Sequence, residues 1–398
     1  MRVLQLHNYH ESKGGDEEVI AHERQLLESA GHEVSEYALP AAVKLALPPI
    51  RAGAKAVWNQ EAYRQVGRRI DTFGPDVVHV HDPYPIMSPS VFWASSRREV
   101  PTVVTMHNYR YTCISADHSR DGLVCEDCVG TVLKLPGIRH RCYHDSIAAS
   151  TAMTVSLDLH RRMRTFHHQV SRYLVLTDFA RRLLIRDGYP AEKIAVKPNS
   201  VRDPGVWPTP SGDRYVAFLG RLLETKGVRT LLDAWRQVPP GLSLHIAGDG
   251  PLRSLVEDRA RTDPSIRYLG WLDSPERVLE LMGGADAVMV PSQWYEGGAP
   301  LVVLRSLSVG TPVVVSDLEN ICGDVVADDA GFTFPMGDSS ALARLLRSLA
   351  EDPARAHDAR LRARASYEKR YAPDRGLELL EAAYRGVLAD RRGPRRRG

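Results

Sequence analysis

Short apolar runs alternate with longer segments of mixed polarity along most of this chain. Most runs have four or five residues, many of them β-branched, which is typical of buried strands. We expect strands at residues 3–7, 77–81, 103–107 and 173–177, and again at 216–220, 244–247, 268–269, 287–290 and 313–316. Strands that alternate with helical segments predict βαβ units and parallel sheets. The pattern therefore predicts the α/β class, with two doubly wound, Rossmann-like parallel-sheet domains.

A stretch rich in proline and glycine, residues 197–214, lies between the two sets of strands and predicts a domain connection. We expect an N-terminal domain over residues 1–197 and a C-terminal domain over 213–374, facing each other across a cleft. A last helical segment, about 375–390, is expected to pack back on the first domain. The basic tail at 391–398 is expected to be solvated.

The most informative segment runs from Ala287 to Ser316. An apolar strand is followed by an acidic glycine loop, a helix over 301–309 and, after Gly310, a second strand. This unit places a helix N-terminus at the carboxyl edge of a parallel sheet, where free N–H groups and the helix dipole favour a diphosphate. Glu296 in the loop would repel phosphate, so we expect it to accept hydrogen bonds from sugar hydroxyls.

Two further loops contain glycine beside a strand end. Gly14 and Gly15 precede a helix that we expect over 17–30 with Asp16 as its N-cap. They permit close approach of a phosphate, although a plain tight turn is the commoner role of such a pair. Arg221 and Lys226 follow the strand at 216–220. They suit phosphate binding, against the alternative of a solvated surface pair.

Composition and charge narrow the range of functions. The chain is 43% apolar and 25% charged, which indicates a globular protein, and its net charge of +3 is too small to indicate a nucleic-acid partner. No apolar run approaches the roughly 20 residues of a membrane span. We see no signal peptide and five cysteines, so we expect a cytoplasmic protein with reduced thiols.

The motifs together resemble glycosyltransferase family 4, the retaining transferases of the GT-B fold. The resemblance is carried by Gly14-Gly15 and by the segments 220–227, 247–252, 268–272 and 296–316. It implies a nucleotide-diphosphate sugar bound mostly on the C-terminal domain and a hydroxyl acceptor that enters from the N-terminal side. It also implies that no metal cofactor is required, since cationic side chains and helix N-termini neutralise the leaving diphosphate.

The resemblance also implies roles for individual residues. Arg221 and Lys226 would hold the distal phosphate, His107 would lie beside the donor sugar, and His81 would be an acceptor-side residue or a structural histidine. The remaining donor-binding positions would be Gly14, Gly15, Gly248, Gly270, Glu296, Gly297, Gly298, Ala299, Leu301, Val302 and Arg305. Together, His107, Glu296, Arg221 and Lys226 form the expected catalytic set.

Arg305 departs from the family pattern. The family usually has a glutamate at this helix position that binds the ribose hydroxyls. An arginine has no acceptor for them. The ribose contact is therefore lost or replaced, and the sequence does not identify the sugar or the base of the donor.

Four of the five cysteines fall within one insertion, residues 113–142. Cys113, Cys125, Cys128 and Cys142 have the spacing C-x11-C-x2-C-x13-C, which suits a structural tetrahedral zinc. Four free thiols, or disulfides in an exported protein, are the alternatives. We expect such a zinc to stiffen the insertion and to take no part in catalysis.

Residues 40–70 mix basic and apolar positions. They suit either a peripheral contact with an anionic membrane or a pair of helices packed on the first domain, and Pro48-Pro49 favours the packed helices.

The function that we expect is retaining transfer of a hexose-type sugar to a hydroxyl acceptor on a polysaccharide, a lipid-linked glycan or a natural product. An epimerase or hydrolase of nucleotide sugars, a non-catalytic nucleotide-sugar-binding protein and a zinc nucleic-acid module are the alternatives. The oligomeric state is not indicated.

Overall fold

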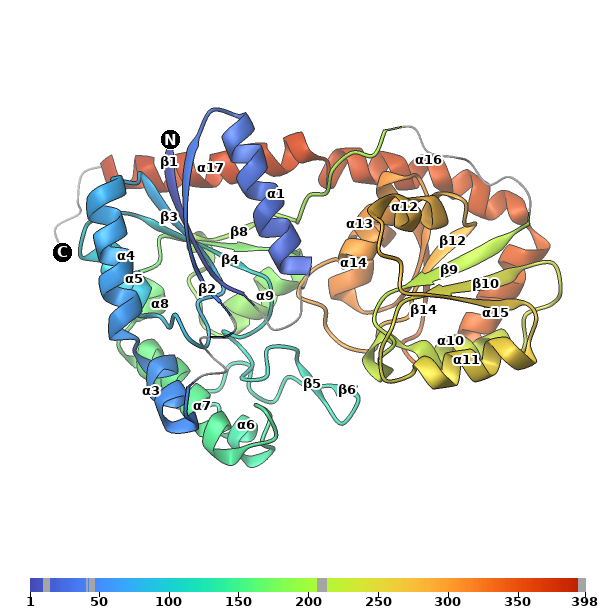
Figure 1. Cartoon of the computed structure of the whole chain (residues 1–398), viewed down its shortest axis with the longest axis horizontal. Helices are drawn as coiled ribbons and strands as arrows, with labels where there is room; N and C mark the ends of the chain where they lie inside the picture. Colours follow the sequence, from blue (N-terminus) through green and yellow to red (C-terminus); the bar gives the residue numbers. More distant parts are fainter. Residues whose placement is uncertain (10–14, 41, 43–46, 206–212, 393–398) are drawn as a thin grey trace. The chain divides into compact units, whose positions relative to one another are not determined.

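The computed structural model describes residues 1–9, 15–40, 42, 47–205 and 213–392 (Figure 1). The chain forms two compact units. The first unit contains residues 1–118, 125–198 and 376–398, and the second contains residues 119–124 and 199–375. No helix among the described residues is both long enough and apolar enough to cross a membrane.

The first unit is a parallel sheet covered by helices. Its strands are β1 (Arg2–Asn8), β2 (Glu33–Leu39), β3 (Val77–His81), β4 (Thr102–Met106), β7 (Arg172–Val175) and β8 (Ile194–Val196). Its helices are α1 (Gly15–Ser29), α3 (Pro49–Val57), α4 (Gln60–Phe73), α5 (Ser90–Ser96), α6 (Leu135–Arg139), α7 (Ile147–Arg162), α8 (Thr165–His168), α9 (Asp178–Arg186), the short η1 (Ala191–Lys193) and most of α17 (Pro373–Arg392). Leu27 of α1 and Leu380 and Tyr384 of α17 are buried in one cluster against β1, β3, β4 and β7.

The second unit has the same plan. Its strands are β9 (Tyr215–Leu219), β10 (Ser243–Ala247), β11 (Ile266–Gly270), β12 (Ala287–Val290), β13 (Val313–Ser316) and β14 (Gly331–Phe334). Its helices are η2 (Glu224–Lys226), α10 (Val228–Trp235), α11 (Arg253–Thr262), α12 (Pro275–Gly283), α13 (Leu301–Ser308), α14 (Glu319–Ala327), α15 (Ser339–Glu351) and α16 (Pro353–Arg370). The antiparallel hairpin of β5 (Ser119–Arg120) and β6 (Leu123–Val124) groups with this unit.

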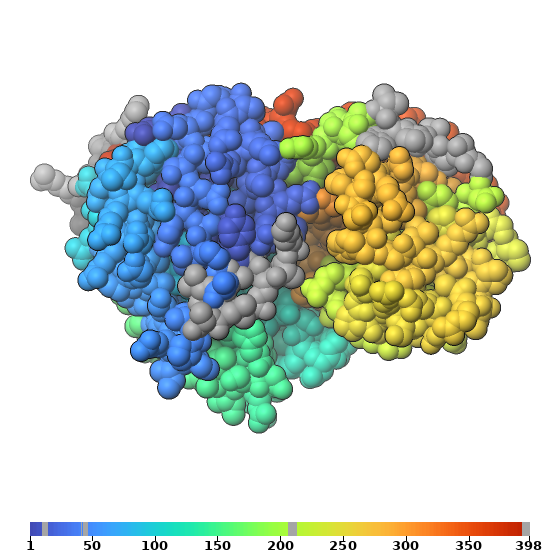
Figure 2. Space-filling view, in the orientation of Figure 1, coloured from blue at the N-terminus to red at the C-terminus, as the bar shows by residue number. Residues whose placement is uncertain are grey.

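Alternation along the strands builds two apolar layers in the second unit, because successive side chains point to opposite faces of a sheet. Val216, Phe218 and Met289 pack with α10, α11 and α15, whereas Ala217 and Val288 pack with α12, α13, α14 and α16. Segments that include α11 and α12 form much of the surface of this unit in Figure 2 (yellow to orange).

The strand order of each sheet defines a switch point. The first sheet has the order β2-β1-β3-β4-β7-β8 and the second has the order β11-β10-β9-β12-β13-β14, with every pair parallel. The order reverses between β1 and β3 in the first unit and between β9 and β12 in the second. Ligands of open α/β sheets bind beyond the carboxyl ends of the strands at such points.

The structure contains every strand that the apolar runs predicted. It adds β2, β8 and β14, which are edge strands, and the β5–β6 hairpin. The expected helix start was wrong in one detail, because Asp16 lies inside the first turn of α1 and is not its N-cap. The basic tail beyond residue 392 and Gly14 lie outside the described residues.

Candidate active site

The switch point of the second unit brings together two residues that the sequence singled out. Lys226 follows β9 at the end of η2, and Glu296 lies in the loop after β12. The Nζ atom of Lys226 donates a hydrogen bond of 2.5 Å to Oε1 of Glu296, and both side chains are mostly buried. A cation and a carboxylate therefore meet where the strand order reverses, 70 residues apart in the chain.

The Glu296 carboxylate is fixed by further donors. Ser292 Oγ and Trp294 Nε1 donate to the same Oε1 atom at 2.9 and 3.0 Å, and Lys226 Nζ lies 5.4 Å from the centre of the Trp294 ring. Asn320 Nδ2 donates to the backbone oxygen of Glu296 at 2.8 Å. The sequence analysis assigned no role to Ser292, Trp294 or Asn320. A hydroxyl and an indole within four residues of Glu296 were the available signal.

Gly227 allows the loop that contains Lys226 to lie close to the loop that contains Glu296. It has a φ of 71°, and a Cβ atom there would lie 1.8 Å from the backbone oxygen of Pro291. Gln293 then donates its N–H to the oxygen of Thr225 at 2.8 Å. A side chain at residue 227 would push the Lys226 loop away from the Glu296 loop, so only glycine is compatible with this arrangement.

Helix α13 begins directly after the loop of Gly297, Gly298 and Ala299. Pro300 precedes its first residue, and no described side chain caps it, so the amides of Leu301 and Val302 lie at an uncapped positive helix end. Arg305 lies one turn further along and is partly exposed.

The glycines on the other side of the switch point have a structural role. Gly248 donates its N–H to the oxygen of Gly270 at 2.8 Å, and a Cβ at Gly248 would lie 1.8 Å from the oxygen of Gly220. The loops after β9, β10 and β11 are therefore held together by backbone contacts that exclude side chains. Trp271, next to Gly270, is 68% exposed, and Arg221 is also exposed.

The predicted residues of the first unit lie at its own switch point. His81 ends β3 and His107 follows β4, with His81 Nδ1 2.9 Å from His107 Nε2 and their rings stacked. His81 is buried, whereas His107 is partly exposed. Gly15 is exposed at the start of α1. The structure thus brings His81 and His107 into direct contact.

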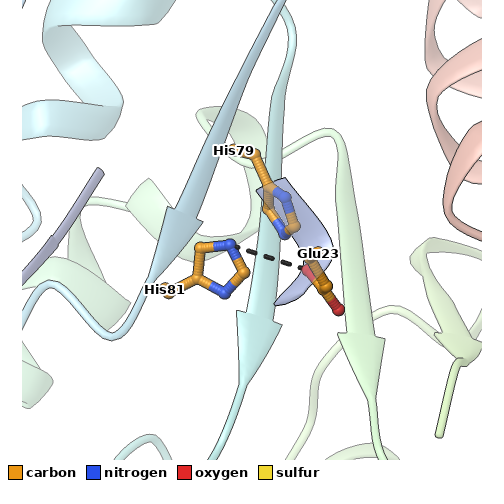
Figure 3. A group of neighbouring side chains, drawn as sticks. All are labelled: Glu23, His79 and His81. Carbon is orange, nitrogen blue, oxygen red and sulfur yellow. Dashed lines mark ion pairs between the residues drawn. The ribbon is translucent and has the colours of Figure 1, made fainter. Parts of the chain in front are cut away.

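His81 also belongs to a buried polar cluster with Glu23 and His79 (Figure 3), two residues that the sequence did not single out. Glu23 of α1 forms an ion pair with Lys197, and its other oxygen, Oε2, lies 3.9 Å from His81 Nε2. His79 contacts Thr105 Oγ1 through Nε2 and Tyr384 OH through Nδ1, each at 2.7 Å. Lys197, the last residue of the expected N-terminal domain and the first of the expected connection, is buried in the first unit.

Burial controls the protonation of this cluster. Loss of solvent lowers the pKa of His79 to about 3 and also lowers that of Lys197, whose charge is supported by the ion pair with Glu23. It holds the pKa of His81 well below its usual range, with further lowering by the neighbouring histidines. Both histidines of β3 are therefore neutral near pH 7, and each carries its proton on one ring nitrogen.

Metal binding is not favoured by these side chains. Among the described residues, which include all five cysteines, only Glu23, His79 and His81 bring three ligand-type atoms within 4.8 Å of one another. The Lys197 ammonium already neutralises Glu23, and both nitrogens of His79 are engaged.

The four clustered cysteines form no disulfide and do not form such a group. Burial raises the pKa of Cys128 to about 12, and the neighbouring Cys113 adds to the shift. The zinc site therefore stays a prediction from spacing, and this geometry does not support it.

The cysteine-rich insertion is instead anchored by a buried ion pair. Lys134 Nζ donates to Asp187 Oδ1 at 2.7 Å and to the oxygen of Cys128 at 2.6 Å. Asp187 also accepts from the N–H of Gly130 at 2.6 Å and pairs with Arg161. The insertion is thus tied to the residue that follows α9.

The family models that match this chain describe glycosyltransferases. The chain matches the family model of Glycosyltransferase Family 4 over residues 2–203 and that of Glycosyl transferases group 1 over residues 202–367. It is 32% identical to glycogen synthase of Mycobacterium tuberculosis over 191 residues, which is 46% of this chain and 45% of that protein. The aligned part thus spans about half the length of this relative.

A second relative and a solved structure match over more of the chain. The phosphatidyl-myo-inositol mannosyltransferase of Mycolicibacterium smegmatis is 27% identical over 85% of this chain and 82% of its own length. The crystal structure of Anabaena Alr3699/HepE in complex with UDP has a TM-score of 0.67 at 16% identity and covers 97% of this chain and 100% of that one. The predicted GT-B class, with two parallel six-stranded sheets in α/β units, is confirmed. The chain belongs to glycosyltransferase family 4.

Proposed function

We propose that this protein is a retaining glycosyltransferase that moves a hexose from a nucleoside-diphosphate sugar to a hydroxyl acceptor. The observation that carries the proposal is the contact between Lys226 and Glu296 at the switch point of the second unit, beside the uncapped N-terminus of α13. A cation and unpaired amides suit a diphosphate, and a carboxylate held by three donors suits sugar hydroxyls.

The transfer follows from these roles. The acceptor oxygen attacks the anomeric carbon as the bond from that carbon to the diphosphate oxygen breaks. The acceptor proton passes to the leaving diphosphate, on the same face of the sugar, so the configuration is retained. Lys226, Arg221 and the amides of Leu301 and Val302 stabilise the charge that develops on the diphosphate. Glu296 and His107 orient the sugar, and the family resemblance assigns no step to a metal.

Binding of the donor is testable without knowledge of the acceptor. We expect one nucleoside diphosphate and its sugar to raise the melting temperature, because a ligand at 100 times its Kd stabilises the native state by about 2.7 kcal/mol. A thermal-shift panel would include UDP and UDP-glucose first, since the Anabaena structure was solved with UDP. The parent nucleoside is the control. If no nucleoside diphosphate shifts the transition, the proposed donor site is wrong.

Turnover then separates the alternatives. An epimerase or a hydrolase would consume the stabilising nucleotide sugar without an acceptor. A non-catalytic binding protein would be stabilised by it and yet form no product with any acceptor in a panel.

A lipid-linked acceptor is the acceptor class that we favour. Helices α3 and α7 pack closely, since a Cβ at Gly53 would lie 3.2 Å from Cβ of Ala152. Beside this contact is an apolar groove of about 800 Å³ whose lining includes Ile50, Ile86, Met153 and Val155. Ile50 is 87% exposed at its rim. The groove is of a size that holds a hydrocarbon chain.

Positively charged side chains near the groove are compatible with a lipid acceptor that carries a phosphate. Arg51 and Lys55 lie on α3 with their side chains at least partly exposed, and they complement the phosphate of an anionic lipid. A phosphatidyl-myo-inositol mannosyltransferase, which is named for a lipid acceptor, is among the relatives. We infer that the hydrocarbon chain of the acceptor lies in this groove, with the protein at the membrane surface.

Replacing Ile50 with glutamate should reduce binding to vesicles of phosphatidylglycerol, because it places a charge at the apolar rim and opposes the anionic surface. Cosedimentation of wild type and variant measures the effect. Leu361→Glu is the matched control, because Leu361 of α16 is 82% exposed but lies in the second unit. Equal binding by wild type and Ile50→Glu, or no binding by wild type, contradicts the lipid proposal.

A further inference from the structure

We propose that Glu23 and Lys197 are positioning residues that set the ring tautomer of His107 through His81. The inference rests on the proposed function insofar as His107 acts beside the donor sugar. The four residues come from α1, the end of β3, the residue after β4 and the residue after β8, and all lie in the first unit.

The first link is the buried ion pair. The side chains of Glu23 and Lys197 are each 1% exposed, and Lys197 donates to Oε1 of Glu23. An ionised carboxylate is stable in such a place only beside a cation. Lys197 therefore holds Glu23 as a carboxylate whose second oxygen, Oε2, faces His81.

The second link sets the proton on His81. Oε2 of Glu23 and Nε2 of His81 lie 3.9 Å apart, and within the described part of the chain neither atom has a hydrogen-bond partner (Figure 3). His81 is neutral, so one ring nitrogen carries a proton and the other a lone pair. A carboxylate attracts the N–H and repels the lone pair. The proton of His81 consequently lies on Nε2, and Nδ1 is an acceptor.

The hydrogen bond between His81 and His107 then determines which nitrogen of His107 carries the proton. Its Nε2 atom lies 2.9 Å from His81 Nδ1, so Nε2 of His107 must donate this hydrogen bond. In its neutral form His107 then has no proton on Nδ1, which is the acceptor nitrogen. An acceptor there can bind a sugar hydroxyl, whereas an added proton would place positive charge near a centre that itself becomes positive during transfer.

A metal centre at the same residues is the less favoured explanation. The Lys197 ammonium occupies the position of a cation beside Glu23, and His79 would have to release Thr105 or Tyr384 to bind an ion. The existing ion pair and hydrogen bonds are sufficient to fix the proton positions on His81 and His107, and no metal ion is needed.

The test combines spectroscopy with kinetics on the full chain. Glu23→Gln/Lys197→Met removes both charges together, so that neither is left buried without a partner. Two-bond ¹H–¹⁵N spectra of protein labelled in histidine show which ring nitrogen of His107 carries the proton, and a His107→Gln spectrum assigns the signal. We expect the proton on Nε2 in the wild type and a mixture of tautomers in the double variant. We also expect kcat to fall about 10- to 100-fold with little change in the donor KM, as is typical of groups that orient a functional histidine.

Two further variants sharpen the result. Glu28→Gln is the matched control, because Glu28 lies on the same helix, pairs with Arg24 at 2.9 Å and is exposed; it should leave the spectra and kcat unchanged. Glu23→Asp keeps the carboxylate, so it should keep the wild-type tautomer, and a mixture of tautomers in this variant would contradict the role of the carboxylate.

The outcomes separate this inference from the proposed function. The spectra are recorded without donor, so they test the tautomer even if no nucleotide sugar is turned over. A His107 proton on Nδ1 in the wild type, or an unchanged tautomer in the double variant, overturns the inference. A changed tautomer with unchanged kcat overturns the positioning role.

Discussion

Replacing Lys226 with alanine should lower kcat/KM for the nucleotide-sugar donor by about 10²- to 10³-fold, the range seen when one stabilising group is removed from a developing anion. Lys226 Nζ lies at the reversal of strand order beside an uncapped helix N-terminus, where we propose that the leaving diphosphate gains charge. Steady-state kinetics with the donor from the thermal-shift panel measure the effect. The fold should persist, because Ser292 and Trp294 still donate to Glu296.

Arg229→Ala is the matched control for this prediction. Arg229 is also a cation, three residues further along, but its side chain is 54% exposed and pairs with Glu224 at 2.7 Å. We expect its loss to leave kcat/KM unchanged, since exposed ion pairs contribute little. Equal effects of Lys226→Ala and Arg229→Ala, or full activity of Lys226→Ala, would show that the cation at residue 226 does not hold the diphosphate.

The strand pattern of the sequence was sufficient for the fold class, for a physical reason. Central strands of a parallel sheet are buried on both faces, so they appear as continuous apolar runs such as Val313–Ser316. The strands that the pattern missed lie mostly at the edges of the sheets. An edge strand is less completely buried, so its sequence need not be a continuous apolar run. β2, for example, has only partly buried or exposed residues.

The sequence predicted the residues proposed to contact the donor, but not the buried residues that position the histidines. Lys226 and Glu296 follow strands and lie beside glycines, and the βαβ plan brings them together. Lys197 and Glu23 are separated by 174 residues. A lone lysine or glutamate in a sequence indicates solvent exposure. No local pattern marks such a pair, and only the packed sheet and α1 bring the two residues into contact.

The ion pair that anchors the cysteine-rich insertion also joins residues far apart in the chain and could not be predicted from a local pattern. The cysteine spacing suggested a metal, whereas the structure ties the insertion to Asp187, which is 53 residues from Lys134. Asp187 follows α9 and has no unusual neighbours in the sequence. Its importance comes from burial, because the side chains of Lys134 and Asp187 are both fully buried.

Replacing Asp187 with asparagine should destabilise the first unit by about 3–5 kcal/mol, because it leaves the Lys134 ammonium buried without its counter-charge. For a unit of this size, such a loss lowers the melting temperature by about 10 °C. Calorimetry measures this change. Limited proteolysis should show faster cleavage in the insertion, because an asparagine has one acceptor oxygen in place of the two that Gly130 and Arg161 use.

Asp390→Asn is the control for this stability effect, because Asp390 pairs with Arg172 at 3.4 Å on the surface of the same unit and is 75% exposed. It should change the free energy of unfolding by less than about 1 kcal/mol. A zinc chelator distinguishes the two ways of holding the insertion. If the chelator lowers the melting temperature of the wild type and Asp187→Asn does not, the cysteines bind a metal that anchors the insertion, and the buried ion pair is only an accessory contact. If Asp187→Asn alone lowers it, charge pairing within the protein is sufficient to hold the loop, and the thiols are not its anchor.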